Sequence, residues 1–269
     1  MPLGANRWGK SRVRVSKVLP GEREDGFIDV DVQVLLQGDV AAAHVEGDNT
    51  GVLPTDTMRN TVYGLAQSHL THDLERFGKV LCEHFTAKDG IDDASVLIEE
   101  QMWQRQTSHG FVGGAEQRVA RVVRGNESST GAGVQGLIVL KTTGSAFEGF
   151  PRDEYTVLPD ATDRLLATSI TADWIYSILP EDTTATWGRV RQVLLDHFFG
   201  DWSASVQHQG YLMGEAVLEV VDEISEISFR LPNQHHLPFD LTRFGLEWEG
   251  TVFHPVSEPH GDIYLTVTR

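Results

Sequence analysis

Residues 137–156 read LIVLKTTGSAFEGFPRDEYT, and the pair Asp163-Arg164 follows a few residues later. The first four residues are apolar and predict a strand, whereas the Lys-Thr-Thr-Gly-Ser run after them is typical of a turn. Beyond the turn come an aromatic ring, that of Phe147, and the guanidinium of Arg164. A flat ring can stack on a planar ligand, and a guanidinium can donate paired hydrogen bonds to it. The stretch therefore predicts a binding site for a planar, oxygen-rich anion at the end of a strand.

The composition limits the kind of partner. The chain has 269 residues, 40% hydrophobic and 23% charged, which is typical of a globular protein with one large or two small domains. Its 39 acidic residues outnumber its 22 basic ones, and the net charge of −17 repels nucleic-acid phosphate and anionic lipid. We therefore expect neither nucleic acid nor a membrane as a partner. An anionic small substrate needs local positive charge in its site, which Lys10 and Arg164 can supply.

The cysteine count and the chain ends bear on the compartment. A single cysteine, Cys82, excludes an intrachain disulfide and fits a reducing environment. No apolar run approaches the ~18 residues that a membrane span needs, and the first residues lack the apolar core of a signal peptide. The last three residues, Val267-Thr268-Arg269, differ from the Ser-Lys-Leu address of peroxisomes. We therefore expect a cytoplasmic protein.

The hydrophobic pattern predicts the same order of elements twice. The first half is predicted to begin with a β-hairpin, whose strands cover residues 13–18 and 28–36 with a turn at 20–26. Two helices follow, one from Asp56-Thr57 and one over about residues 71–85, and then two strands at 95–102 and 118–123. A polar break follows at residues 125–131. The second half is predicted to have strands at 134–140 and 165–176, helices at 186–199 and 209–221, and strands at 227–231 and 263–267. We therefore predict an α+β fold of two tandem ββααββ domains, residues 1–132 and 133–269.

The stretch 137–156 with Asp163-Arg164 resembles the signature of the urate oxidase (uricase) family. Four further motifs are similar to landmarks of that family and occur in its order: Arg7–Val15 around Lys10, Gly47–Tyr63 with Thr55-Asp56-Thr57, Ser203–Gln207 and Ser228–His235. The departures are small, namely Trp8 for a usual Tyr, Pro54 before Thr55, Arg59 for a usual Lys, and Gln234 between Asn233 and His235. None of them removes a functional group that the chemistry of the family uses.

The resemblance implies a fold and an assembly. It implies the tunnelling fold, in which antiparallel sheets of paired subunits close into a barrel with the helices outside. It also implies a homotetramer whose active sites are shared between subunits. In that arrangement Phe147, Arg164 and Gln207 belong to one subunit, and Lys10, Thr55 and His235 reach in from the next.

The resemblance also implies a reaction, the oxidation of urate by O2 and water to 5-hydroxyisourate and hydrogen peroxide, with no metal and no cofactor. For substrate binding it assigns Phe147 to stack on the purine, Arg164 to form a forked hydrogen bond, and Val206 and Gln207 to contact the ring edge. For catalysis it assigns Lys10 and Thr55 to proton transfer, with His235 behind them. It also assigns Asn233 and Thr55 to hold dioxygen or water above the ring, and Asp56 to tie the loop to the purine edge.

Each of these residues alone has a plainer explanation. Thr55-Asp56-Thr57 can be a helix N-cap, Phe147 and Phe150 can be core aromatics, and Arg164 can form a surface ion pair with Asp163. Two other functions stay open as well. The first is a zinc-dependent pterin-type enzyme of the same fold, for which the histidines are available at positions 208, 235, 236, 254 and 260, although their spacing is poor for zinc. The second is an inactive tunnelling-fold protein that binds a ligand or serves assembly.

Overall fold

The computed structural model describes residues 2–19 and 26–269 of the chain. They form two compact units. Unit 1 runs to Val134 and also contains Asp173–Trp187, and unit 2 consists of Gln135–Ala172 and Gly188–Arg269. Most of the turn predicted at residues 20–26 lies outside the described residues.

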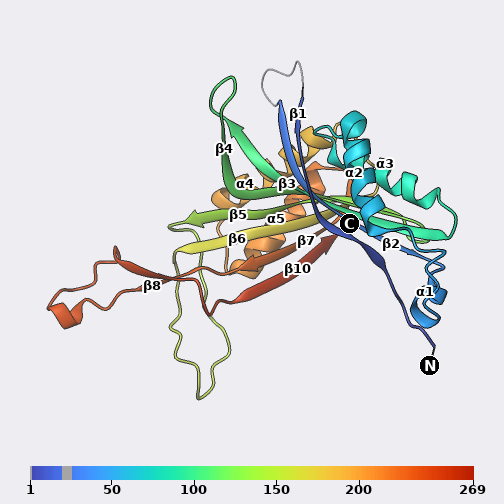
Figure 1. Ribbon diagram of the computed structural model, residues 1–269. Coiled ribbons are helices and arrows are strands. Elements are labelled where there is room, and N and C mark those ends of the chain that lie inside the picture. The colour runs from blue at the N-terminus through green and yellow to red at the C-terminus, as the bar shows by residue number, and fades with distance from the viewer. Residues whose placement is uncertain (1, 20–25) are drawn as a thin grey trace. The chain divides into compact units, whose positions relative to one another are not determined.

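In unit 1 an antiparallel sheet has the strand order β1-β2-β3-β4 (Figure 1). The strands are β1 (Trp8–Val18), β2 (Phe27–Gly38), β3 (Ile91–Arg105) and β4 (Phe111–Arg124). The hairpin predicted from the alternating pattern is confirmed, since β1 and β2 pair antiparallel. On β2, Val30, Val32 and Val34 are fully buried, and the polar residues between them face the opposite side of the sheet.

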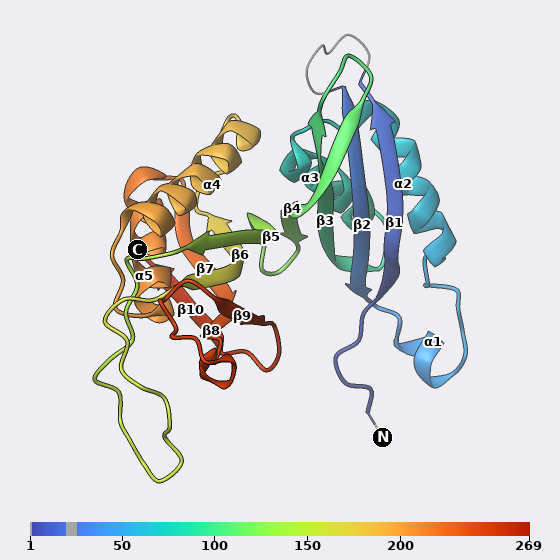
Figure 2. The ribbon, with the colours of Figure 1, turned by 90° about the vertical axis from the view of Figure 1, so that its left-hand side faces the viewer.

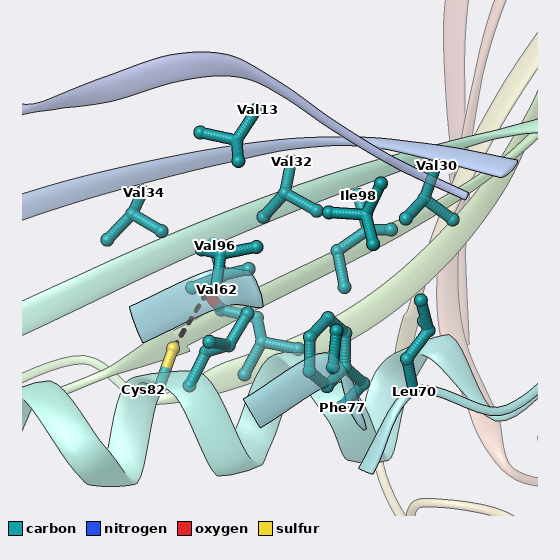
Figure 3. Close-up of a cluster of buried hydrophobic side chains, with 14 of the residues drawn as sticks. Val13, Val30, Val32, Val34, Val62, Leu70, Phe77, Cys82, Val96 and Ile98 are labelled. Carbon is teal, nitrogen blue, oxygen red and sulfur yellow. Dashed lines mark hydrogen bonds between the residues drawn. The ribbon is translucent and has the colours of Figure 1, made fainter. Parts of the chain in front are cut away.

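Two helices, α2 (Thr55–His69) and α3 (Leu74–Thr86), cover the apolar face of this sheet, and a short helix, α1 (Ala41–Val45), precedes them (Figure 2). Phe77 of α3 belongs to one buried cluster with the valines of β2 and the apolar residues of β3 (Figure 3). Cys82 lies in the same core, and its thiol donates a hydrogen bond to the carbonyl of Ala94 at 3.5 Å. Burial raises the pKa of this thiol to about 12, so it stays protonated.

The predicted N-cap of the first helix is wrong. The cap position of α2 is Pro54, no side chain caps the helix, and Thr55 is already its first residue. Proline has no side-chain acceptor, so the first amides of the helix are not capped as the sequence suggested. The next helix does have such a cap, since Asp73 accepts a hydrogen bond from the backbone N–H of Arg76 at 3.0 Å.

In unit 2 the neighbouring strands follow the order β5-β6-β7-β10, and β7 and β10 pair antiparallel. The strands are β5 (Ser129–Lys141), β6 (Leu166–Tyr176), β7 (Ile224–Pro232) and β10 (Asp262–Thr268), and the helices are α4 (Thr183–Gly200) and α5 (Val206–Val220). The first residues of β5 and α4 and the last of β6 belong to unit 1. Helix α5 lies close on the sheet because it has glycine at the contact, where a Cβ on Gly214 would come within 2.6 Å of Cγ2 of Val267.

Both units therefore follow the ββααββ order, and the predicted α+β class is confirmed. Between β7 and β10 the structure inserts a small hairpin of β8 (His235–Pro238) and β9 (Phe253–Val256), with the 3-10 turn η1 (Thr242–Phe244) at its tip. Sequence analysis missed this hairpin, because four-residue strands show too little alternation to be recognised. A second long excursion joins β5 to β6 (Figure 1).

Candidate active site

The excursion between β5 and β6 brings Phe147 and Arg164 together in unit 2. The backbone N–H of Phe147 donates to the carbonyl of Ala161 at 2.7 Å, and the N–H of Ala161 donates back at 2.9 Å. The N–H of Arg164 donates to the carbonyl of Ser145 at 2.7 Å. These bonds close the loop at its base, so that Cζ of Arg164 lies 5.3 Å from the centre of the Phe147 ring. Phe150 stacks against that ring, with centroids 4.9 Å apart.

The guanidinium of Arg164 is half-buried and incompletely paired. Among the residues that the structure describes, nothing accepts a hydrogen bond from its Nε. Burial lowers the pKa of this guanidinium, because a desolvated charge is disfavoured. A buried cationic donor without an acceptor costs free energy that an anionic ligand would recover.

Asp163 does not form the predicted surface ion pair with Arg164. Its carboxylate accepts hydrogen bonds from the backbone N–H of Gly144 at 2.8 Å and from the hydroxyl of Thr143. The Thr143 bond is the largest cause that lowers the pKa of Asp163. Asp163 thus holds the turn after β5 in place and leaves the neighbouring guanidinium free for another partner.

The start of α5 is tied to the same loop. Ser203 N–H donates to the carbonyl of Gly144 at 3.0 Å, and Ala146 N–H donates to the carbonyl of Ser203 at 2.8 Å. Ser205 caps α5 by accepting from the N–H of His208 at 3.1 Å. Val206 and Gln207 are the first two residues of the helix; Val206 is buried and Gln207 is exposed.

Lys141, at the end of β5, supports the connection between this loop and α5, a role that the sequence did not predict. Its Nζ donates to the carbonyl of Asp201 and to Oε1 of Gln209, both at 2.7 Å. The Gln209 amide in turn donates to the carbonyl of His197 at 2.9 Å. Burial lowers the pKa of Lys141, against the opposing effect of Asp201 and Asp163. The sequence offered one signal for this role, a lysine that directly follows the apolar run Leu137–Leu140.

Asn233 and His235 lie beside this loop. Asn233 forms a β-bridge with Thr168 of β6, and its amide Nδ2 lies 3.4 Å from Nδ1 of His235. The pKa of His235 is lowered, first by burial, then by the charges of Arg164 and His260. The expectation that His235 reaches in from another subunit is therefore wrong. The Thr168–Asn233 bridge joins β6, which begins just after Arg164, to a residue just before His235. Arg164 and His235 therefore lie in the same unit of one chain.

The remaining predicted residues lie in unit 1. Lys10 is half-buried on β1, and Thr55 and Asp56 are exposed at the start of α2. Asp56 pairs with Arg59 at 2.8 Å. The indole N–H of Trp8 donates to the carbonyl of Leu53 at 3.1 Å, and this bond ties β1 to the segment that leads into α2.

In residues 2–19 and 26–269, no three or more His, Cys, Asp and Glu side chains gather closely enough to hold a metal ion. The histidines on which a zinc enzyme would depend thus form no ligand set there. No helix of this part of the chain has both the length and the apolar surface to cross a membrane.

Two consecutive ββααββ units define a tunnelling-fold protein. The family model for uricase matches this chain twice, over residues 6–132 and 130–264. The chain belongs to the uricase family, which confirms the resemblance found in the sequence. It is 39% identical to the uricase of Arthrobacter globiformis over 272 residues, covering 99% of this chain and 90% of the relative. It is 36% identical to the uricase of Dictyostelium discoideum, covering 98% and 96%. The crystal structure of the Arthrobacter globiformis uricase superimposes with a TM-score of 0.95, covering 100% of this chain and 95% of the other.

Proposed function

We propose that this protein is a urate oxidase. It converts urate, O2 and water to 5-hydroxyisourate and hydrogen peroxide, so that urate loses two electrons and O2 gains them. The observation that carries the proposal is the half-buried guanidinium of Arg164, unpaired at Nε among the described residues and set against the ring of Phe147. Membership of the uricase family supports it.

Four residues of unit 2 bind the substrate. Urate is flat and anionic, so its ring stacks on Phe147 and its oxygen and nitrogen edge accepts the forked donors of Arg164. At the start of α5, the Gln207 amide can both donate to a carbonyl and accept from an N–H of the purine, and Val206 offers its backbone. The bonds between the turn after β5 and Ser203 support this arrangement, because they tie the two segments together.

Lys10, Thr55 and His235 carry out the proton transfer. Once a proton is removed, the electron-rich urate dianion can give an electron directly to dioxygen, so the reaction needs no redox metal or organic cofactor. Lys10 and Thr55 accept the proton from urate, and His235 lies next to this pair. Asn233 and Thr55 hold dioxygen, and then water, over the ring, while Asp56 ties the loop to the purine edge.

The working form is a homotetramer in the cytoplasm, in which each site is completed by two subunits. One subunit supplies Lys10, Thr55 and Asp56; the other supplies the residues of unit 2, His235 included. The open antiparallel sheets of paired subunits close into a barrel with the helices outside. The chain divides into tunnelling-fold domains at residues 1–132 and 133–269, which is supported by the two family matches that meet near residue 130.

The deciding experiment is an oxidation assay. The purified protein is incubated with urate in air, and the loss of urate absorbance in the ultraviolet is followed together with the appearance of hydrogen peroxide. We expect both, in equal amounts. If neither occurs in a folded, oligomeric sample, the protein is not a urate oxidase.

A further inference from the structure

The pairing of β1 with β2 is interrupted immediately beside Lys10. Lys10 lies opposite Val34 and Val13 lies opposite Val32, so the two residues between them, Ser11 and Arg12, together face a single residue of β2. Arg12 has a φ of 61° and is the one non-glycine residue with a positive φ in the described part of the chain. Two residues opposite one, with one of them in the left-handed region, form a β-bulge.

The bulge changes the side of the sheet to which Lys10 points. In a regular strand, residues three apart lie on opposite faces. Val32 and Val34 are both fully buried on the face that α2 and α3 cover, and directly opposed residues share a face. Lys10 and Val13 therefore lie on that same face, although they are three apart. If the same residues paired regularly, without the bulge, Lys10 would lie opposite Leu35 and point to the opposite, polar face.

The neighbouring residues fit this local geometry. A Cβ on Gly9 would come within 1.9 Å of the carbonyl oxygen of Val34, so only glycine allows β1 to lie this close to β2 beside the bulge. The hydroxyl of Ser11 accepts a hydrogen bond from Nε2 of Gln33 at 2.8 Å, which holds the bulge on the polar side. Trp8, on the same face as Lys10, is fixed by its bond to the carbonyl of Leu53.

We propose that the bulge at Ser11-Arg12 is the device that directs Lys10 to the helix-covered face, where α2 begins with Thr55. Ser11 and Arg12 are positioning residues, and their role does not depend on their side-chain charge. The inference rests on the proposed function, because it assumes that Lys10 takes part in the removal of the proton. Bulges beside active sites re-aim side chains in this way in other proteins.

Three variants of one position test the proposal, and all of them remove the guanidinium of Arg12 together with its ion pair to Asp31. Arg12→Gly adopts a positive φ without strain, so it keeps the bulge and should keep the parental kcat. Arg12→Val disfavours that φ and favours regular pairing. It should lower kcat on the order of 10²-fold, as for a misplaced catalytic group. The affinity for xanthine, a planar purine that requires no proton transfer, should change little.

Deletion of Arg12 is the third variant and the most informative one. With one residue fewer, a regular strand again places Lys10 opposite Val34, so the deletion variant should be much faster than Arg12→Val. If Arg12 only stabilised the fold, the deletion variant should be slower than Arg12→Val, because removing a residue from a strand disturbs the structure more than a substitution does. The proposal is overturned if Arg12→Val oxidises urate at the parental rate, or if the deletion variant is as slow as Arg12→Val.

Crystal structures of the same variants provide a readout that does not depend on activity. We expect Lys10 opposite Leu35 in Arg12→Val, and opposite Val34 in the deletion variant. If the parental chain does not oxidise urate, the proposed function fails while these structures still test the bulge. If Lys10 remains opposite Val34 in Arg12→Val, the bulge does not set its direction.

Discussion

At the scale of single residues, Lys10 is the side chain on which the proposed proton transfer depends. Lys10→Met should slow urate oxidation by a factor on the order of 10²–10⁴, the usual effect of losing a general acid or base. Xanthine binding should change far less, because Lys10 does not hold the ring. The measurement is steady-state kcat alongside xanthine affinity.

Lys88→Met is a suitable control for that change, since Lys88 is another half-buried lysine of unit 1 and lies just after α3. It should oxidise urate at the parental rate. If Lys10→Met did so as well, Lys10 would not be the base.

Arg164 and Phe147 are the residues expected to hold the purine. Arg164→Ala should weaken binding of planar purine anions by ~2–5 kcal/mol, the range for truncating one partner of a buried charged pair. Phe147→Ala should weaken it too, through lost stacking area. Calorimetric titration with xanthine measures both.

The same loop offers a matched control for the arginine. Cζ of Arg152 lies 4.7 Å from the ring centre of Phe150, a geometry close to that of Arg164 on Phe147, but Arg152 pairs with Asp160 at 3.1 Å. Arg152→Ala should therefore leave xanthine affinity nearly unchanged. Equal affinities in Arg164→Ala, Phe147→Ala and the parent would place the ligand elsewhere.

At the scale of elements, Lys141 links the end of β5 to the connection between α4 and α5. Lys141→Met leaves the Asp201 carbonyl and the Gln209 amide oxygen without their buried donor. It should reduce the free energy of unfolding by ~1–3 kcal/mol. Because Val206 and Gln207 begin the helix that this contact supports, KM for urate should rise more than kcat falls.

Urea denaturation and steady-state kinetics measure the two effects. Lys141→Arg, which keeps a cationic donor, should recover part of both. A Lys141→Met protein with parental stability and parental KM would show that the contact does not position α5.

At the scale of the whole molecule, the cofactor-free mechanism predicts that activity is independent of metal. Exhaustive chelation should leave urate oxidation intact, because the urate dianion can transfer an electron to dioxygen without a redox metal. Elemental analysis should find no stoichiometric Zn, Cu or Fe in the active protein. Loss of activity that one added metal restores would contradict the mechanism and favour a metalloenzyme.

The proposed sharing of sites between subunits can be tested by complementation. Thr55→Ala and Arg164→Ala chains should each be inactive alone but regain activity when they are unfolded and refolded together. With random pairing of subunits, about a quarter of the sites would have both halves intact, since symmetric oligomers repeat the same interface. The parental protein, refolded in the same way, calibrates the yield. Mixed oligomers without recovery would show that each chain builds its own site.

Local patterns predicted much of the fold. The hairpin of β1 and β2, the buried face of α3 and the long strands of unit 2 follow from alternation or helical spacing, which are properties of a few consecutive residues. The predicted cap of α2 is wrong, because Thr55, Asp56 and Thr57 resemble N-cap residues, whereas Pro54 takes the cap position. The hairpin of β8 and β9 is too short for any periodicity to reveal it.

By itself the sequence determined the α+β class, the repeat of ββααββ and the family, and it indicated a ring and a guanidinium after β5. Only the tertiary structure decided that His235 lies with Arg164, that Lys141 supports the start of α5, and that Lys10 faces the helices. Each of these depends on the pairing of segments remote in sequence, and in the case of Lys10 on a single extra residue in a strand. A one-residue change in register moves a side chain to the other face of a sheet, and no local pattern records that register.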